Sequence, residues 1–301
     1  IYLSVFALDI TKQMIRNLFI IGMATAGMIK AANAQTMVIT TASYKGTVGS
    51  YPVAMQLQQK RQSDTLNGSY YYLRSGREKK IGLTGILQHP TSLTEKVTVE
   101  KNGKYVRETT GRFSITAPLL ATGQLKGSWT NLKTGKQLPV QLQLLAAAEN
   151  APVFYDYELV IHKEKIINLS KQEELRYKAT ALKIIQEGKV LQTLSGFSEF
   201  IGNQPEIELE DLNFDGHFDI KIPISFPDRT KYDGSFLYFI YNPSTQKFIR
   251  HQQLIDLEYL LFDPVKKEVY KYSEAPEGFV INCYKWRGNE VYLDHTEKAQ
   301  E

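Results

Sequence analysis

The stretch Glu206-Ile-Glu-Leu-Glu-Asp-Leu-Asn-Phe-Asp-Gly-His-Phe-Asp-Ile-Lys-Ile-Pro-Ile-Ser-Phe226 decides the fold of this 301-residue chain. Acidic and apolar residues alternate at its beginning, and apolar residues occupy every second position from Ile220 to Phe226. Side chains that alternate with period two point to opposite faces of a β-strand. The stretch therefore predicts two β-strands joined by a loop, and not the paired helices of an EF-hand.

The loop between these strands carries side-chain oxygens at regular intervals. Counted from Asp211, they fall at positions 1, 3, 5 and 9, and glycine occupies position 6. Ca²⁺ takes about six to eight oxygen ligands from a tight loop, and the glycine permits the sharp turn. We predict a calcium site in which His217 contributes its backbone carbonyl, with the ligand residues Asp211, Asn213, Asp215, His217 and Asp219. Position 12, a glutamate in EF-hands, is Ile222, and a solvated turn without metal is the alternative.

The beginning of the chain has the pattern of an export signal. Arg16 precedes an apolar run at residues 18–29, and Ala32-Asn-Ala34 follows as a small-x-small cleavage site. We expect a signal peptide at residues 14–34, cleaved near Ala34, and a periplasmic or secreted protein. Residues 1–13 are interpreted as upstream read-through. Lys30 ends the apolar run short of the roughly 20 residues of a membrane span, so we expect no stable membrane anchor, although a retained anchor is the alternative.

Charge divides the remaining chain into two parts. Residues 35–148 hold 15 Lys and Arg against 5 Asp and Glu, a formal net charge of +10. Residues 149–301 hold 18 against 26, a formal net charge of −8. Such asymmetry indicates two modules with different partners, or two faces that attract each other. The periodicity stops at residues 145–152, where we place the boundary.

Both parts predict an all-β fold made of two antiparallel β modules. In residues 35–148, turn signals recur roughly every 8–12 residues, which predicts a sandwich or a small barrel. Leu66-Asn-Gly-Ser-Tyr70 and Leu125-Lys-Gly-Ser-Trp129 form a weak internal repeat, whose glycine we interpret as a tight turn or bulge. Residues 149–301 predict a hairpin-rich β domain that contains the calcium loop, with a hairpin at Glu187-Gly-Lys189 and one ambiguous helical turn at residues 172–178.

The sequence contains no recognisable catalytic constellation. The histidines are isolated from one another, and neither an H-E-x-x-H nor a G-x-S-x-G motif is present (His89, His162, His217, His251 and His295). The single cysteine, Cys283, excludes an intramolecular disulfide and lies in an alternating run, which favours a buried structural thiol. Basic residues do not cluster on one element as in a nucleic-acid reader. We expect a binding protein with no nucleic-acid partner, and not an enzyme.

Four segments of the second module carry a resemblance to a known family. They are Gly188-Lys-Val-Leu-Gln-Thr-Leu194, residues 209–219, Tyr238-Phe-Ile-Tyr-Asn-Pro243 with Lys247-Phe248, and an aromatic hairpin at residues 284–292. In their order and spacing, residues 153–294 resemble exported calcium-binding proteins that include periplasmic immunity proteins against peptidoglycan-degrading effectors. Their fold is similar to that of bacterial inhibitors of i-type lysozymes. The first module looks like a β domain common in exported bacterial proteins.

The resemblance implies a periplasmic protein that inhibits a lysozyme-like cell-wall hydrolase, with calcium as structural cofactor. In the inhibitory relatives, a Ser-Gly-x-x-Tyr element enters the hydrolase cleft. Here the matching stretch is Arg229-Thr-Lys-Tyr-Asp-Gly-Ser-Phe236, so the resemblance suggests an exposed loop tip at Tyr232, Gly234 and Ser235, unless the stretch is an ordinary Asp-Gly hairpin turn.

The alternative function is a cell-envelope glycan-binding or adhesion module without inhibitory activity. Its platform would be the aromatic residues 70–72 together with Trp129. The sequence gives no signal for an oligomeric state.

Overall fold

The computed structural model describes residues 36–116, 123–146, 151–168, 170–226, 234–276 and 278–299. Thr36–Glu301 forms one compact unit. The predicted signal peptide lies outside the described residues. Among the residues that are described, no helix has the length and the apolar character needed to cross a membrane.

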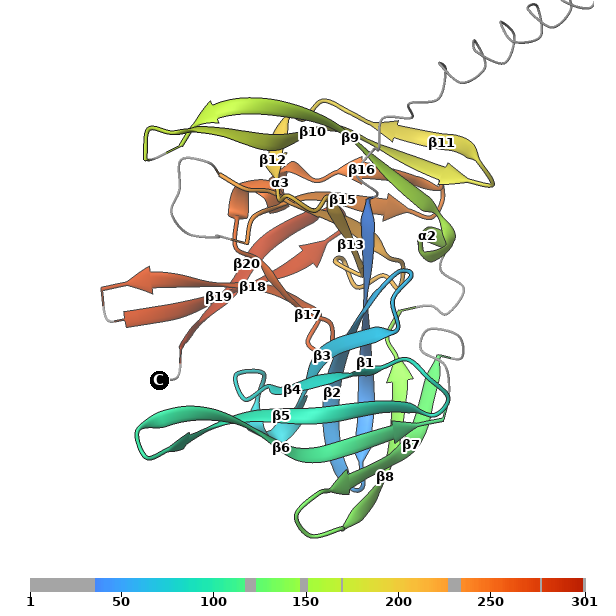
Figure 1. The fold of residues 1–301 in the computed structure, drawn as a ribbon, viewed down its shortest axis with the longest axis vertical. Coiled ribbons are helices and arrows are strands. Elements are labelled where there is room, and N and C mark those ends of the chain that lie inside the picture. Colours follow the sequence, from blue (N-terminus) through green and yellow to red (C-terminus); the bar gives the residue numbers. More distant parts are fainter. Residues whose placement is uncertain are drawn as a thin grey trace, which may run out of the picture. The chain divides into compact units, whose positions relative to one another are not determined.

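Eight antiparallel strands form a closed barrel in the first half of the chain (Figure 1). Each strand pairs with the next, and pairing of β1 with β8, from Tyr44 opposite Leu144 to Val48 opposite Val140, closes the barrel. The strands are β1 (Met37–Val48), β2 (Tyr51–Lys60), β3 (Thr65–Tyr72), β4 (Ile81–Ile86), β5 (Thr91–Lys101), β6 (Lys104–Ile115), β7 (Gln124–Asn131) and β8 (Gln137–Leu144). The prediction of an antiparallel sandwich or barrel is therefore confirmed, and the barrel is the one that forms.

The internal repeat is a pair of equivalent barrel strands. Leu66 and Tyr70 on β3, and Leu125 and Trp129 on β7, are all buried. A Cβ atom at Gly68 would collide with the backbone of the neighbouring strand, and the same holds for Gly127. The glycines thus allow close approach of two strands inside regular sheet, and the interpretation of a turn or bulge is wrong.

The second half of the chain adds three groups of strands. One group extends the barrel sheet through β13 (Glu206–Glu210), β14 (Asp219–Pro223), β15 (Phe236–Asn242) and β16 (Lys247–Arg250). The second contains β9 (Asp156–Ile167), β10 (Glu173–Gln186), β11 (Lys189–Leu194) and β12 (Glu199–Ile201). The third contains β17 (Leu261–Asp263), β18 (Glu268–Ala275), β19 (Gly278–Arg287) and β20 (Glu290–Lys298). Short helical segments are η1 (Leu73–Ser75), α2 (Ala151–Phe154) and α3 (Gln252–Leu257).

The hairpin predicted at Glu187-Gly-Lys189 is confirmed, because it joins β10 to β11. The helical turn considered at residues 172–178 is wrong. Residues 173–178 of that segment belong to β10, which pairs with β9 on one side and with β11 and β12 on the other.

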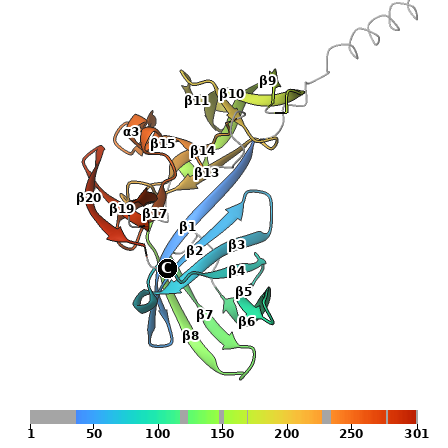
Figure 2. The same cartoon turned by 90° about the vertical axis from the view of Figure 1, so that its left-hand side faces the viewer.

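The predicted boundary between residues 148 and 149 does not separate two compact units, so this prediction is corrected. β1 belongs to both halves, since it pairs with β2 and β8 and also runs parallel to β13, with Met37 opposite Glu206. Figure 2 shows β1 continuing from the barrel to β13. One hydrophobic core accordingly includes Tyr44 of the barrel together with Tyr157, Ile207 and Phe239 of the second half.

Candidate functional site

The oxygen-rich loop connects β13 to β14 at a rigid place in the fold. All five residues of β14 are buried. Two apolar side chains of the loop, Leu212 and Phe218, are buried in different hydrophobic clusters. The loop is thereby held on both sides of its polar centre.

Side-chain oxygens of the loop gather around its own backbone N–H groups. Asp211 Oδ1 and Asn213 Oδ1 both accept a hydrogen bond from the N–H of Asp215, at 3.1 and 3.2 Å. Asp211 Oδ2 accepts from the N–H of Gly216 at 3.0 Å. Phe214 and Gly216 have φ angles of 61° and 93°, which produce the sharp turn expected at the glycine. The structure therefore brings Asp211 and Asn213 together over one side of the loop.

Asp215 and His217 complete this polar surface. Asp215 Oδ1 accepts from the N–H of His217 at 2.8 Å, and Asp215 Oδ2 accepts from Asn213 Nδ2 at 2.9 Å. The imidazole of His217 packs against Tyr241 with ring centroids 5.8 Å apart. This placement agrees with a ligand role for His217 through its backbone carbonyl.

Asp219 differs from the other three acidic or amide residues of the loop. It is fully buried, and its two carboxylate oxygens accept hydrogen bonds from the N–H groups of Leu212 and Tyr241, each at 2.8 Å. Burial raises the pKa of this carboxyl well above its ordinary value. In this geometry Asp219 ties the loop to β15 and positions it, and the ligand role of its side chain stays a prediction.

The charge of the loop is unbalanced without a cation. Burial, with the nearby Asp215 carboxylate adding to it, raises the pKa of Asp211 from 3.8 to about 7, although three backbone N–H groups oppose the shift. A hard cation would replace that proton. The donor set of two carboxylates, an amide oxygen and a backbone carbonyl fits calcium chemistry, with Asp211, Asn213, Asp215 and His217 as the residues that would hold it.

The predicted partner-binding residues are placed only in part. Tyr232 lies outside the described residues. Gly234 adopts a φ of 61°, and Ser235 is buried, with its carbonyl accepting a hydrogen bond from the N–H of Ile224 at 3.0 Å. The expected exposure of Ser235 is therefore wrong, because the chain rejoins the β14 side of the sheet before β15 begins.

The aromatic platform predicted for glycans is wrong at two of its four residues, because residues 71 and 72 are half-buried and the other two are buried. Tyr70 and Trp129 lie inside the barrel, where Glu95 accepts hydrogen bonds from the hydroxyl of Tyr70, from Trp129 Nε1 at 2.5 Å and from Thr110 Oγ1 at 2.9 Å. Burial and the Glu95 carboxylate raise the pKa of Tyr70 far above its ordinary value. The two aromatics thus satisfy a buried carboxylate and present no face to a ligand.

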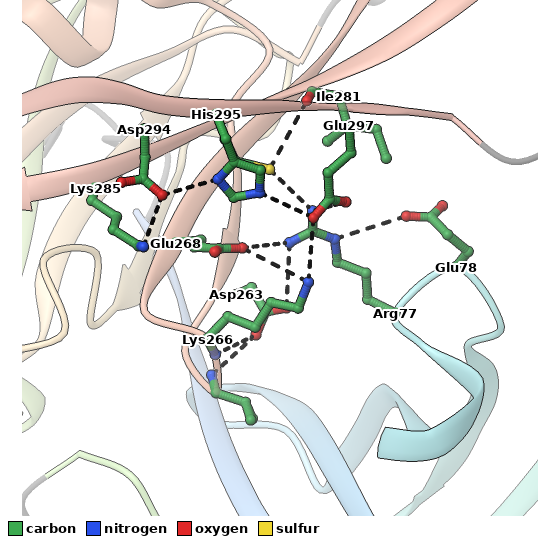
Figure 3. Close-up of polar contacts among 12 residues, drawn as sticks. Arg77, Glu78, Asp263, Lys266, Glu268, Ile281, Lys285, Asp294, His295 and Glu297 are labelled. Carbon is green, nitrogen blue, oxygen red and sulfur yellow. Dashed lines mark hydrogen bonds and ion pairs between the residues drawn. The ribbon is translucent and has the colours of Figure 1, made fainter.

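A second polar cluster, which the sequence did not reveal, surrounds Arg77 (Figure 3). This side chain follows η1, is 7% exposed and forms ion pairs with carboxylates of the third group of strands. Its Nη1 lies 3.5 Å from Asp263 Oδ2 and 3.2 Å from Glu268 Oε2, and its Nη2 lies 3.4 Å from Glu297 Oε2. The guanidinium also stacks 4.0 Å from the centre of the Tyr270 ring. The basic and acidic halves of the sequence therefore attract each other here, as one of the two interpretations of the charge split expected.

Cys283 lies in the same cluster. Among the described residues, the one group of three His, Cys, Asp or Glu side chains with all ligand atoms within 4.8 Å of one another is Cys283, His295 and Glu297. Both nitrogens of His295 already contact carboxylates, Asp294 at 2.9 Å and Glu297 at 3.1 Å, and Arg77 Nη2 donates to the Cys283 sulfur at 3.4 Å. Arg77 supplies the positive charge that a metal would bring. The prediction of a buried structural thiol is supported, and burial raises the pKa of Cys283.

No family model, curated protein or solved structure matches this chain. The family resemblance of the second module and the calcium site therefore stay predictions.

Proposed function

We propose that this protein is an exported binding protein that inhibits a cell-wall hydrolase of the lysozyme type, with calcium as structural cofactor. The observation that carries the proposal is the position of β14. This fully buried strand begins at the calcium loop with Asp219 and leads directly to Ile224 and Ser225.

Backbone hydrogen bonds fix the chain on both sides of the point where it leaves β14. The N–H of Ser225 donates to Phe200 O at 2.8 Å, and the N–H of Ile224 donates to Ser235 O at 3.0 Å. The connection from β14 to β15 thus leaves from a fixed base and returns to it. A partner-binding segment on a fixed base loses less conformational entropy on binding, which favours high affinity.

Calcium would act on this base and not on a reaction. Bound to Asp211, Asn213, Asp215 and the His217 carbonyl, it would neutralise the loop's negative charge, and Asp219 would transmit its position to β15 through Tyr241 N–H. The formal charge of −8 on residues 149–301 would also steer the protein to basic hydrolases.

The test is a pull-down of the purified protein against a panel of lysozymes, the i-type included, and secreted peptidoglycan hydrolases, followed by affinity measurement. For a hydrolase that binds, Tyr232→Ala should weaken affinity about thirtyfold, equivalent to about 2 kcal/mol, because a buried aromatic anchor dominates interface energy. Tyr105→Ala is the matched control, since Tyr105 is a 79% exposed tyrosine on the β6 side of the barrel. Equal loss in both variants, or none in either, would remove Tyr232 from the interface.

A further inference from the structure

A wide groove lies on the outer face of the barrel. Its volume is about 910 Å³, within the range of small-ligand sites. One wall is formed by the barrel strands β1 to β6, and the other by the segment Leu260-Leu-Phe262 with Tyr270 of the third group of strands. Glu210 of β13 and Lys221 of β14 also line the groove. Figure 1 shows β17 on the side of the barrel where β2, β3 and β4 run.

The barrel wall of the groove is built from a regular array of polar positions. Gln56, Ser69, Gly82 and Lys96 are direct neighbours across four adjacent strands. Directly opposite partners share one face of a sheet, so these positions form one row across the groove. A second row contains Gln58, Asn67 and Thr84. Amide and hydroxyl groups of this kind donate to and accept from ligand hydroxyls.

The groove carries an excess of positive charge. Five basic residues line it, Lys79, Lys80, Lys96, Arg107 and Lys221. Lys221 is paired with Glu208 and Glu210, and within the described parts of the chain none of the other four forms an ion pair with a carboxylate. One acidic residue lines it, Glu210, and its Oε2 is already paired with Lys221 Nζ at 2.6 Å. A ligand that enters the groove therefore meets about four uncompensated cations beside the hydrogen-bonding rows.

We propose that this groove binds an acidic oligosaccharide, whose carboxylates or sulfates contact the cations and whose hydroxyls contact the amide and hydroxyl rows. The strands of the wall are paired on both sides, so they offer no free backbone edge to an extended peptide. The aromatic residues of the groove, Phe262 and Tyr270, are 7% and 3% exposed, so they offer no stacking surface to nucleic-acid bases. The four unpaired cations and the two polar rows include no residue of the loop between β13 and β14 or of β14 itself, on which the hydrolase proposal rests.

Gly82 gives the groove its depth at the centre of the first row. A Cβ atom there would meet only the Lys96 carbonyl oxygen, at 3.4 Å, which is ordinary van der Waals contact. A larger side chain at this position therefore fits the fold and projects into the groove.

The experiment is calorimetric titration of the purified protein with a galacturonic acid tetramer and a heparin-derived tetramer, with the methyl-esterified galacturonate tetramer as neutral probe. We expect at least one acidic probe to bind, more weakly as salt rises, and the neutral probe to bind at least tenfold more weakly. Lys96→Gln with Arg107→Gln should weaken binding of the acidic probe at least tenfold, because charge-assisted hydrogen bonds are stronger than neutral ones. Gly82→Leu should do the same by filling the groove. Lys133→Gln with Lys136→Gln, two exposed lysines of the barrel outside the groove, should change affinity less than about twofold.

Three results would overturn the proposal. The first is binding of neither acidic probe. The second is unchanged affinity in both the Lys96/Arg107 variant and Gly82→Leu, with circular dichroism showing both folded. The third is equal or tighter binding of a glutamate oligomer of the same charge, which would mean that the groove responds to charge alone and not to sugar hydroxyls.

Discussion

Replacement of Arg77 by methionine tests the attachment of the barrel to the third group of strands. Methionine retains the apolar stem and removes the guanidinium. Two buried carboxylates would lose the guanidinium, since the side chains of Asp263 and Glu268 are 4% and 8% exposed. Lys266 would stay 4.0 Å from Glu268, and two backbone N–H groups would still donate to Asp263. Glu78 and Glu297, at 36% and 38%, remain hydrated and should contribute little.

The expected loss of unfolding free energy is about 3–5 kcal/mol, the range observed when one partner of a buried ion pair is removed. Loss of the cation–π contact with Tyr270 lies within that range. For a domain of this size, each kcal/mol lowers the melting temperature by roughly 2–4 °C, so the midpoint should fall by roughly 6–20 °C.

The assay is guanidinium unfolding of the purified protein at pH 7, followed by circular dichroism and by tryptophan fluorescence. Arg74→Met is the matched control, because Arg74 is an exposed arginine of η1. Adding Glu268→Gln to Arg77→Met should recover part of the loss, since it removes one of the two buried carboxylates that lose the guanidinium. A loss below about 1 kcal/mol, or one equal to that of Arg74→Met, would refute the structural role assigned to this cluster.

Three further predictions concern the loop and the barrel. Calcium at hundreds of times its dissociation constant should stabilise the fold by about 3–4 kcal/mol, so a chelator should lower the melting temperature, and Asp215→Ala should abolish that response. An unchanged melting curve in chelator, with no metal bound to the protein, would show that the loop is a turn that binds no metal. With chelator present, the pKa of Asp211 near 7 means that its protonated form stabilises the fold fully below pH 3.8, and that this stability, about 2–4 kcal/mol, is lost as pH rises through 7. Thermal melts of the wild type relative to Asp211→Asn should show this decline in stability, and a difference in melting temperature that stays constant between pH 4 and 8 would contradict the raised pKa. Gly127→Ala should destabilise the barrel by about 1–3 kcal/mol because its Cβ would collide with the backbone of Ser114, whereas Gly82→Ala, where the nearest atom is 3.4 Å away, should be close to neutral in the same denaturation assay.

Local sequence patterns predicted the elements whose structure depends on residues close together in the chain. The strand–loop–strand at residues 206–226 follows from period-two alternation around an Asp- and Gly-rich turn, and the structure contains it as β13, the loop and β14. The equivalent strands β3 and β7 were detectable because their Leu-x-Gly-x-aromatic spacing repeats. The same spacing could have shown that Tyr70 and Trp129 point inward, since each lies four residues from a buried leucine and therefore shares its face.

Long-range features left no comparable signal. The parallel pairing of Met37 with Glu206 joins segments about 170 residues apart, and no sequence pattern in either segment indicates that the other is its partner strand. Arg77 resembles any charged loop residue until Asp263, Glu268 and Cys283 are placed around it. The groove was missed for a similar reason, because its cations come from separate strands and loops and are brought together only by the pairing of those strands.

The central claim, inhibition of a cell-wall hydrolase, is tested most directly by the clearing of a peptidoglycan suspension by each hydrolase of the panel, with increasing amounts of the protein in calcium-containing buffer. The account predicts that the rate of clearing by at least one lysozyme-like hydrolase falls to zero near a 1:1 molar ratio, and that calcium removal or Asp215→Ala reduces the inhibition. If every hydrolase clears the suspension at its full rate in the presence of excess protein, and none is retained in the pull-down, the claim is contradicted.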